Sequence, residues 1–405
     1  MTDLLEFENG IGIKGRKVDN IRKIIRYLSR HKEPLSIPEI ASFIDVSIPI
    51  CASLIRELSN QNYVIKQGKK SSENGRKPFT YCLNKNSFNV IGVEILSKFI
   101  QLSIFNIELD EIYTFTDRNF TLTNDKECLN NITTFIEKVI LGSGISKNKV
   151  IGIGIGMQEA VRNSNSELSN YFLEDLILLK EHLKSNLNLS VIVDIDTRTI
   201  AVAEQILGKA KGVDNALVVK ASRALGLSII ADRHIISGSH GVAGSINHTH
   251  FKKGNRLCDC GKTGCLGTEI GGNALLSDLK SAIIDGEVSI HFNKSNLFDY
   301  TYHDILDAAS KGDELSIKLI QEQGFKLGKA LGNIINILDP ELVIIGGEFV
   351  MVKDFFIDPV KMGIIKTSQI NTVQRCEVIA STLGRYLGAK AGACMLLKAC
   401  EMIDF

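Results

Sequence analysis

The sequence lacks several features that define specialised classes of protein. It has only six prolines in 405 residues, and 44% of its residues are hydrophobic, which argues against a low-complexity or disordered chain. No apolar run reaches membrane-spanning length, and the acidic residues 1–9 have no apolar core typical of a secretory signal. We therefore expect a folded cytoplasmic protein without a membrane partner, and the length predicts two or three domains.

The cysteines do not indicate a disulfide framework, because nothing in the sequence points to an oxidising compartment. Six of the nine are scattered, and we interpret them as small buried apolar side chains: Cys51, Cys82, Cys128, Cys376, Cys394 and Cys400. The other three, Cys258, Cys260 and Cys265, stand within eight residues of one another. That spacing is typical of a metal site.

Charge is unevenly distributed along the chain, although the net charge is only +1. Residues 1–88 hold fifteen Lys and Arg against nine Asp and Glu, a difference of +6, so the remainder carries −5. This asymmetry favours a small basic nucleic-acid module joined to a larger acidic body.

The first eighty residues follow a helix-turn-helix pattern. An apolar stripe predicts a helix over residues 20–30, and two further helices are expected over 38–44 and 48–61, separated by a short turn. Strands over 63–65 and 79–83, joined by a polar and basic loop over 67–77, predict a winged hairpin. The alternative is a three-helix domain with a solvated charged hairpin.

The spacing, the wing and the basic excess together favour double-stranded DNA as the partner of a domain over residues 1–84. The last helix of such a domain enters the major groove. The wing contains Gly75, which allows close backbone approach to DNA. The candidate DNA-binding residues are Ser47, Ser53 and Arg56 on the helix and Arg76 and Lys77 on the wing.

From residue 89 onward, apolar strands alternate with helical segments. Strands are predicted over 90–95, 99–106, 150–156, 191–194, 216–220, 225–231 and 342–345, and helices over 130–140, 173–184, 199–207, 304–311 and 314–337. This alternation predicts an α/β architecture whose strands are buried on both faces.

Four motifs in this body carry a family resemblance: a Gly-Ile-Gly strand over 150–156, a glycine-rich stretch over 238–244 followed by a histidine and a cysteine knuckle over 258–265, a strand and turn over 337–347, and a glycine-containing helix over 383–393. With them, residues 18–400 resemble the ROK family (repressors, open reading frames and kinases). The winged helix-turn-helix resembles its DNA-binding repressor branch, related to the N-acetylglucosamine and xylose repressors. The resemblance implies that residues 89–405 form an actin- and hexokinase-like (ribonuclease H-like) domain of two subdomains with a cleft between them.

Departures from the kinase pattern indicate that the chain is not an enzyme. Kinases of the family have small residues in two phosphate loops, whose backbone amides hold phosphate. The matching stretches here, 94–98 and 222–226, have lost glycine at Leu96, Ser222 and Ala224, and Glu348 replaces a glycine of the adenosine turn. Gln158 and Glu159 replace a Pro-Gly pair. Since all these changes affect one ligand, we predict that ATP-dependent phosphorylation is absent.

The resemblance also implies a structural zinc site, the zinc knuckle at 248–265. One imidazole and three thiolates form a closed tetrahedral set: His248, Cys258, Cys260 and Cys265. Because no coordination position is left open for water, zinc catalysis is not expected. The alternative is a coincidental group of buried cysteines. His250 is a competing imidazole, but its position does not match the family pattern.

Asp196 and His248 are the candidate effector-binding residues, since the resemblance implies a sugar cleft there. Asp196 follows a strand and precedes a helix, as ligand-binding groups of α/β proteins do. Its alternative role is to cap that helix. Arg198 stands where Asn is usual, and Ser245 and Gly267 stand where the family has glutamates.

The sequence therefore predicts a repressor of carbohydrate genes, controlled by a sugar or sugar-phosphate effector. Two alternatives stay open: an active ROK sugar kinase that carries a DNA-binding domain, and a DNA-binding protein regulated by a protein partner, with a vestigial sugar cleft. A homodimer or a dimer of dimers is expected, because helix-turn-helix proteins usually read two half-sites.

Overall fold

The computed structural model describes residues 13–31, 33–69, 78–123, 125–158, 176–251, 256–384 and 387–402. They belong to two compact units. Unit 1 comprises Met1–Glu159, Asn170–Thr199 and Gly388–Phe405, and unit 2 comprises Ala160–Ser169 and Ile200–Leu387.

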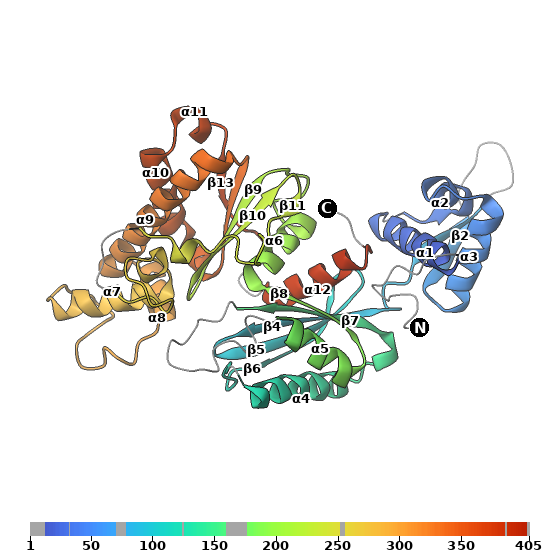
Figure 1. Cartoon of the computed structure of the whole chain (residues 1–405), viewed down its shortest axis with the longest axis horizontal. Helices are drawn as coiled ribbons and strands as arrows, with labels where there is room; N and C mark the ends of the chain where they lie inside the picture. Colours follow the sequence, from blue (N-terminus) through green and yellow to red (C-terminus); the bar gives the residue numbers. More distant parts are fainter. Residues whose placement is uncertain are drawn as a thin grey trace. The chain divides into compact units, whose positions relative to one another are not determined.

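Unit 1 begins with three helices and a small sheet, drawn in blue in Figure 1: α1 (Ile13–Arg30), β1 (Leu35–Ser36), α2 (Ile37–Phe43), α3 (Ile48–Asn60), β2 (Val64–Lys69) and β3 (Phe79–Leu83). The three strands are antiparallel in the order β1-β3-β2. A capping box between Ser36 and Glu39 starts α2. Asp45, with a φ of 54°, makes the turn to α3, and the two helices are bent by 110°. The predicted helix-turn-helix and hairpin strands are present, and Arg76 and Lys77 lie outside the described residues.

The first helix is longer than the predicted 20–30 because it starts at Ile13. Its early residues are mostly polar, so the apolar stripe begins only at Ile21. None of the described helices is by itself long and apolar enough to cross a bilayer, and α2 and α3 meet the length and composition test only as a bent pair.

The body of unit 1 is a five-stranded sheet: β4 (Asn89–Leu96), β5 (Phe99–Asn106), β6 (Glu111–Asp117), β7 (Val150–Met157) and β8 (Ser190–Ile195). The order is β6-β5-β4-β7-β8, with β4, β5 and β6 antiparallel and β7 and β8 parallel to β4. Figure 1 shows α4 (Lys126–Gly142) and α5 (Leu176–Leu187) on one face and α12 (Gly388–Ala399) on the other.

Glycines in the two central strands allow α12 to approach the sheet closely. A Cβ atom on Gly92 would lie 1.7 Å from the backbone oxygen of Ala389, and one on Gly154 would lie 1.9 Å from that of Gly392. Any larger residue would therefore push the helix away. The glycines of the 150–156 motif thus have a packing role.

Unit 2 repeats the same topology: β9 (Ala216–Ala221), β10 (Leu225–Ala231), β11 (His234–Ile235), β12 (Leu342–Gly346) and β13 (Glu377–Ala380), in the order β11-β10-β9-β12-β13. The first three are antiparallel, and β12 and β13 run parallel to β9. The sheets of the two units have the same strand order, which confirms the predicted ribonuclease H-like fold of two subdomains.

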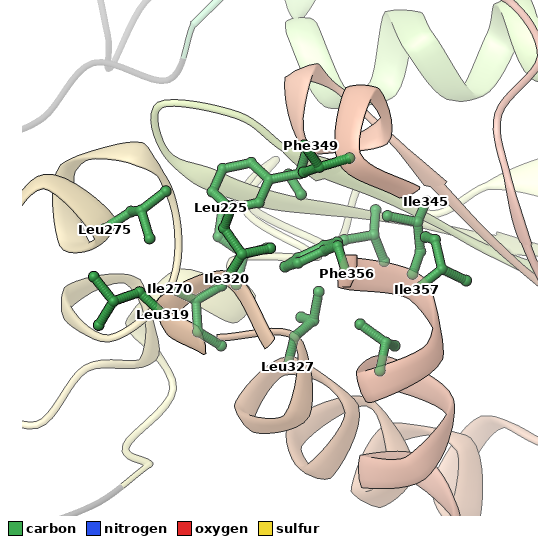
Figure 2. Packing of buried hydrophobic residues seen from close by; sticks show 14 of the residues in the cluster. Leu225, Ile270, Leu275, Leu319, Ile320, Leu327, Ile345, Phe349, Phe356 and Ile357 are labelled. Carbon is green, nitrogen blue, oxygen red and sulfur yellow. The ribbon is translucent and has the colours of Figure 1, made fainter. Parts of the chain in front are cut away.

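Helices cover both faces of the second sheet. Val219 and Ile345 face a large core (Figure 2) made with α7 (Gly272–Ile284), α8 (Tyr302–Ser310), α9 (Glu314–Leu338) and α10 (Lys353–Thr367). Val218 and Ile344 point to the opposite face, where Ala201 of α6 (Asp196–Leu207) packs. The short α11 (Ile370–Val373) leads into β13. This alternation explains why the strands read as continuous apolar runs.

Candidate functional site

The structure brings together the four predicted metal ligands in unit 2. Nδ1 of His248 lies 3.5 Å from Sγ of Cys258, and the Sγ atoms of Cys260 and Cys265 are 3.6 Å apart. All four ligand atoms lie within 4.8 Å of one another. His250 forms a backbone bridge with Cys265 but is not part of the cluster.

Local backbone geometry forms the knuckle. The N–H of Gly261 donates to the carbonyl of Cys258, and the N–H of Cys258 donates to that of Lys262, both at 2.8 Å. Gly261 and Gly264 have φ values of 83° and 82°, a conformation that side chains rarely adopt. The chain therefore turns sharply enough to place thiols from both sides of the turn around one point.

The spacing of the ligand atoms fits a tetrahedral zinc ion. With Zn–S bonds of about 2.3 Å, sulfur atoms in a tetrahedron are about 3.8 Å apart. A disulfide requires about 2.05 Å, so Cys260 and Cys265 are not bonded to each other. Burial raises the pKa of Cys258 and raises that of Cys265 to about 12, so a bound cation has to displace protons from these thiols.

The second nitrogen of His248, Nε2, lies 3.1 Å from the side-chain amide nitrogen of Asn247. A histidine that binds metal through Nδ1 carries its proton on Nε2, so it needs an acceptor there. The amide oxygen of Asn247 supplies one if the amide is turned over, since the two orientations are assigned from hydrogen bonding. Sequence reasoning missed Asn247, whose side-chain amide contacts the histidine ring.

The predicted DNA-contacting residues of α3 lie on its exposed side. Ser47 is the N-cap, and Ser53 and Arg56 follow on the solvent face. The opposite side of the helix is buried through Cys51, Leu54, Ile55 and Leu58. Beyond its first turn, the helix therefore exposes polar and basic side chains that the domain core does not use.

In unit 1, the stretch that matches the first phosphate loop is a tight hairpin. Leu96 pairs directly with Phe99, so only two residues connect β4 and β5. The N–H of Ser97 donates to the side-chain oxygen of Gln158 at 3.2 Å. A backbone donor of this loop is therefore already satisfied by the protein's own amide group.

The carboxylate of Glu94, at the end of β4, lies against the start of α12. A Cβ atom on Gly388, the first residue of that helix, would be 1.9 Å from the carboxyl carbon of Glu94. The N-terminus of a helix attracts negative charge through its unpaired amides. This internal carboxylate thus lies at a place where a helix can bind an anion.

In unit 2, the residues that replace loop glycines bind each other. The hydroxyl of Ser222 donates to the carboxylate of Glu348 at 2.5 Å, and that of Tyr302 donates to the same oxygen at 2.7 Å. The ring of Tyr302 lies over Gly272, where a Cβ atom would approach it to 2.5 Å. Burial, together with the nearby Glu348 charge, raises the pKa of Tyr302 above its ordinary value. These side chains form a polar cluster beside the stretch that matches the second phosphate loop, and sequence reasoning missed Tyr302.

Asp196 is buried at the first position of α6, directly after β8. Its backbone carbonyl accepts a hydrogen bond from the hydroxyl of Thr199 at 2.8 Å. Beside it, Nε of the buried Arg198 donates to Asp194 at 2.7 Å, and the N–H of Ile195 donates to the same carboxylate oxygen. Asp196 belongs to unit 1 and His248 to unit 2.

The positions that lack the family's glutamates have other roles in unit 2. The Ser245 hydroxyl donates to the carbonyl of Val242 at 2.8 Å. A Cβ atom on Gly267 would lie 3.0 Å from that of Asn247, so this glycine allows close packing beside the metal cluster. Glu269 is buried and paired with Lys326 at 3.3 Å.

The duplicated sheet topology places the body of the chain in the actin- and hexokinase-like class. The model of the ROK family matches residues 90–399, so the chain belongs to the ROK family.

The chain is similar to a repressor, a sugar kinase and a transcriptional regulator of known sequence or structure. The chain is 25% identical over 374 residues to the xylose repressor of Caldicellulosiruptor bescii, covering 92% of this chain and 93% of that protein. It is 29% identical over 276 residues to the glucokinase of Halalkalibacterium halodurans, covering 65% of this chain and 81% of that enzyme. The crystal structure of a ROK family transcriptional regulator, a homolog of the Escherichia coli MLC protein, matches with a TM-score of 0.77 and 21% identity over 95% of this chain and 97% of that one. This last likeness shows that the fold is shared along nearly the whole chain.

Proposed function

We propose that the chain is a DNA-binding transcriptional repressor of carbohydrate genes that responds to a sugar or sugar-phosphate effector. The observation that carries the proposal is that α3 of the helix-turn-helix exposes Ser53 and Arg56. In the same chain, Gln158 binds a backbone donor of the first phosphate-loop stretch, and Glu348 accepts from the Ser222 hydroxyl of the second. Similarity to the xylose repressor over 92% of the chain supports it. In this proposal residues 1–84 bind DNA and residues 89–405 bind the effector.

The DNA contacts follow from the helix-turn-helix geometry. Ser53 and Arg56 of α3 reach base edges, and Ser47 at the helix start faces a phosphate. Arg76 and Lys77, which lie outside the described residues, supply wing charge to a groove or phosphate. A homodimer or a dimer of dimers in the cytoplasm reads paired half-sites.

The absence of kinase activity is part of the same proposal. A nucleotide needs free backbone donors and small residues around its phosphates. Here Gln158 accepts from one such donor, and Glu348 brings a negative charge to the second loop, where it would repel a phosphate. Both effects act against ATP.

We assign a structural zinc ion to His248, Cys258, Cys260 and Cys265. The ligand type and the distances between ligand atoms support it. Bound zinc would hold the connection from η3 (Ile246–His248) to η4 (Leu266–Thr268), next to the start of α7.

Asp196 and His248 are the effector contacts in this proposal, each argued within its own unit. Asp196 supplies a buried carboxylate at a strand end, and His248 supplies an exposed imidazole ring that bound zinc would hold in place. The alternative is regulation by a protein partner with a vestigial sugar cleft, which the altered positions Ser245 and Gly267 favour.

The test uses the intact chain and a duplex that it selects from a random pool. Xylose, N-acetylglucosamine, their phosphates and ATP are added one at a time, and duplex binding and heat release are measured. Each sugar is also incubated together with ATP, and the sugar phosphate is assayed. We expect one sugar or sugar phosphate to weaken DNA binding by about 5–150-fold, as typical allosteric coupling does, and Asp196→Ala to abolish the response. Selection of no duplex contradicts the repressor function, whereas ATP-dependent sugar phosphorylation supports the kinase.

A further inference from the structure

The first turn of α3 carries three consecutive exposed apolar residues, Ile48, Pro49 and Ile50, called here the apolar tip. Ile48 is 54% exposed and Ile50 is 51% exposed. The buried side of the helix begins at Cys51, so the domain core does not use the tip. Single exposed aliphatic residues are ordinary, but neighbouring ones suggest a contact with a partner.

The tip lies where a helix-turn-helix first meets DNA. The bend of 110° between α2 and α3 is typical of a helix-turn-helix. In this motif the later helix, here α3, is the recognition helix, whose N-terminal residues contact base edges. Ser53 lies one turn after Ile50, and Arg56 follows on the exposed side. Ile48 and Ile50 therefore lie on the two flanks of the exposed side that carries the proposed base-reading residues.

Aliphatic side chains can recognise only one feature of the major groove. The C5-methyl group of thymine is its apolar group, whereas the other base edges present hydrogen-bond donors and acceptors. Covering those polar edges with an aliphatic group leaves them unsatisfied, which costs binding energy.

We propose that Ile48 and Ile50 read thymine methyl groups in the operator and so determine part of its sequence. This inference rests on the proposed DNA-binding function. A methyl group removed from water contributes enough free energy to change an equilibrium about three- to fivefold.

Charge favours DNA over a protein as the partner of this surface. Residues 1–88 carry a difference of +6 between basic and acidic residues. Such an excess attracts a polyanion and discourages a second copy of the same domain.

The experiment replaces thymidine by deoxyuridine, which lacks only the methyl group. The intact chain first selects a duplex from a random pool of about 30 base pairs, long enough for two half-sites. That duplex is then synthesised with one deoxyuridine at a time, and its affinity is measured by fluorescence anisotropy. We expect about three- to fivefold weaker binding at one or two positions in each half-site.

Variants identify the residues that read the methyl groups. Ile50→Ala, or Ile48→Ala for a different position, should bind the thymidine and deoxyuridine duplexes equally. Ile112→Ala is the matched control, because Ile112 is 48% exposed on β6, outside the helix-turn-helix. This variant should keep the sensitivity of the wild type.

Three results overturn the inference. If the wild type prefers its selected duplex but ignores every deoxyuridine, the tip does not read methyl groups, while the DNA-binding function stands. If no duplex is selected over the random pool, both fail. If Ile50→Ala lowers the mass found by sedimentation, the tip is a contact between copies of the chain.

Discussion

Replacing Cys265 by serine tests the metal site most directly. Cys265 is 2% exposed, and its Sγ lies 3.6 Å from that of Cys260, so the change removes one ligand from the centre of the cluster. A serine hydroxyl is a poor zinc ligand compared with a thiolate. We expect the wild type to contain about one zinc ion per chain and Cys265→Ser to contain almost none.

The loss of stability follows from mass action. A ligand present at about a thousand times its dissociation constant stabilises the folded state by about 4 kcal/mol. Unit 2, with its main segment Ile200–Leu387, is in the size range in which about 1 kcal/mol shifts the melting temperature by about 2–4 °C. Losing the zinc should therefore lower the melting temperature of this unit by about 8–16 °C.

Calorimetry with elemental analysis measures both effects. Cys376→Ser is the matched control, because Cys376 is also buried in unit 2 but does not belong to the cluster. It makes the same chemical change, so it should keep its zinc and melt close to the wild type. The reasoning is refuted if the wild type holds no zinc, or if both variants melt at the same temperature.

Other predictions concern DNA binding, alkaline stability and packing. Arg56→Ala should weaken duplex binding, which is contradicted if salt titrations of variant and wild type coincide. Because the pKa of Tyr302 is raised above the unfolded value of about 10, stability should fall as the pH rises above about 10, and denaturant titrations should show a smaller fall for Tyr302→Phe. Gly347 and Gly312 have φ values of 91° and 90°, but only on Gly347 would a Cβ atom meet a backbone oxygen, that of Ala221 at 2.2 Å. Gly347→Ala should therefore destabilise unit 2 by about 2 kcal/mol or more beyond Gly312→Ala, and equal urea midpoints would contradict this.

Elements with a clear apolar pattern could be read from the sequence alone. The strand over 79–83 and the strands over 99–106 and 225–231 are present with the predicted bounds. They alternate or are continuously apolar because one or both faces are buried. The sequence also predicted the cysteine knuckle, because its ligands are close in sequence and its glycines allow the turn.

Other elements carried no such signal. β6 is largely exposed, so its sequence lacks a run of buried residues. A proline usually indicates the end of a helix, but α10 continues through Pro359. Tertiary packing overrides these local preferences because α10 buries Phe356 and Val360 in the core of unit 2.

The sequence by itself determined which positions had lost the small residues of a phosphate loop, because that requires only residue types. Only the tertiary structure decided which partners the altered positions bind: Gln158 accepts from Ser97 across 61 positions of the chain, and Glu348 accepts from Ser222 across 126. Such partners are brought together by the pairing of β4 with β7 and of β9 with β12, and long-range strand pairing leaves no local signal in the sequence.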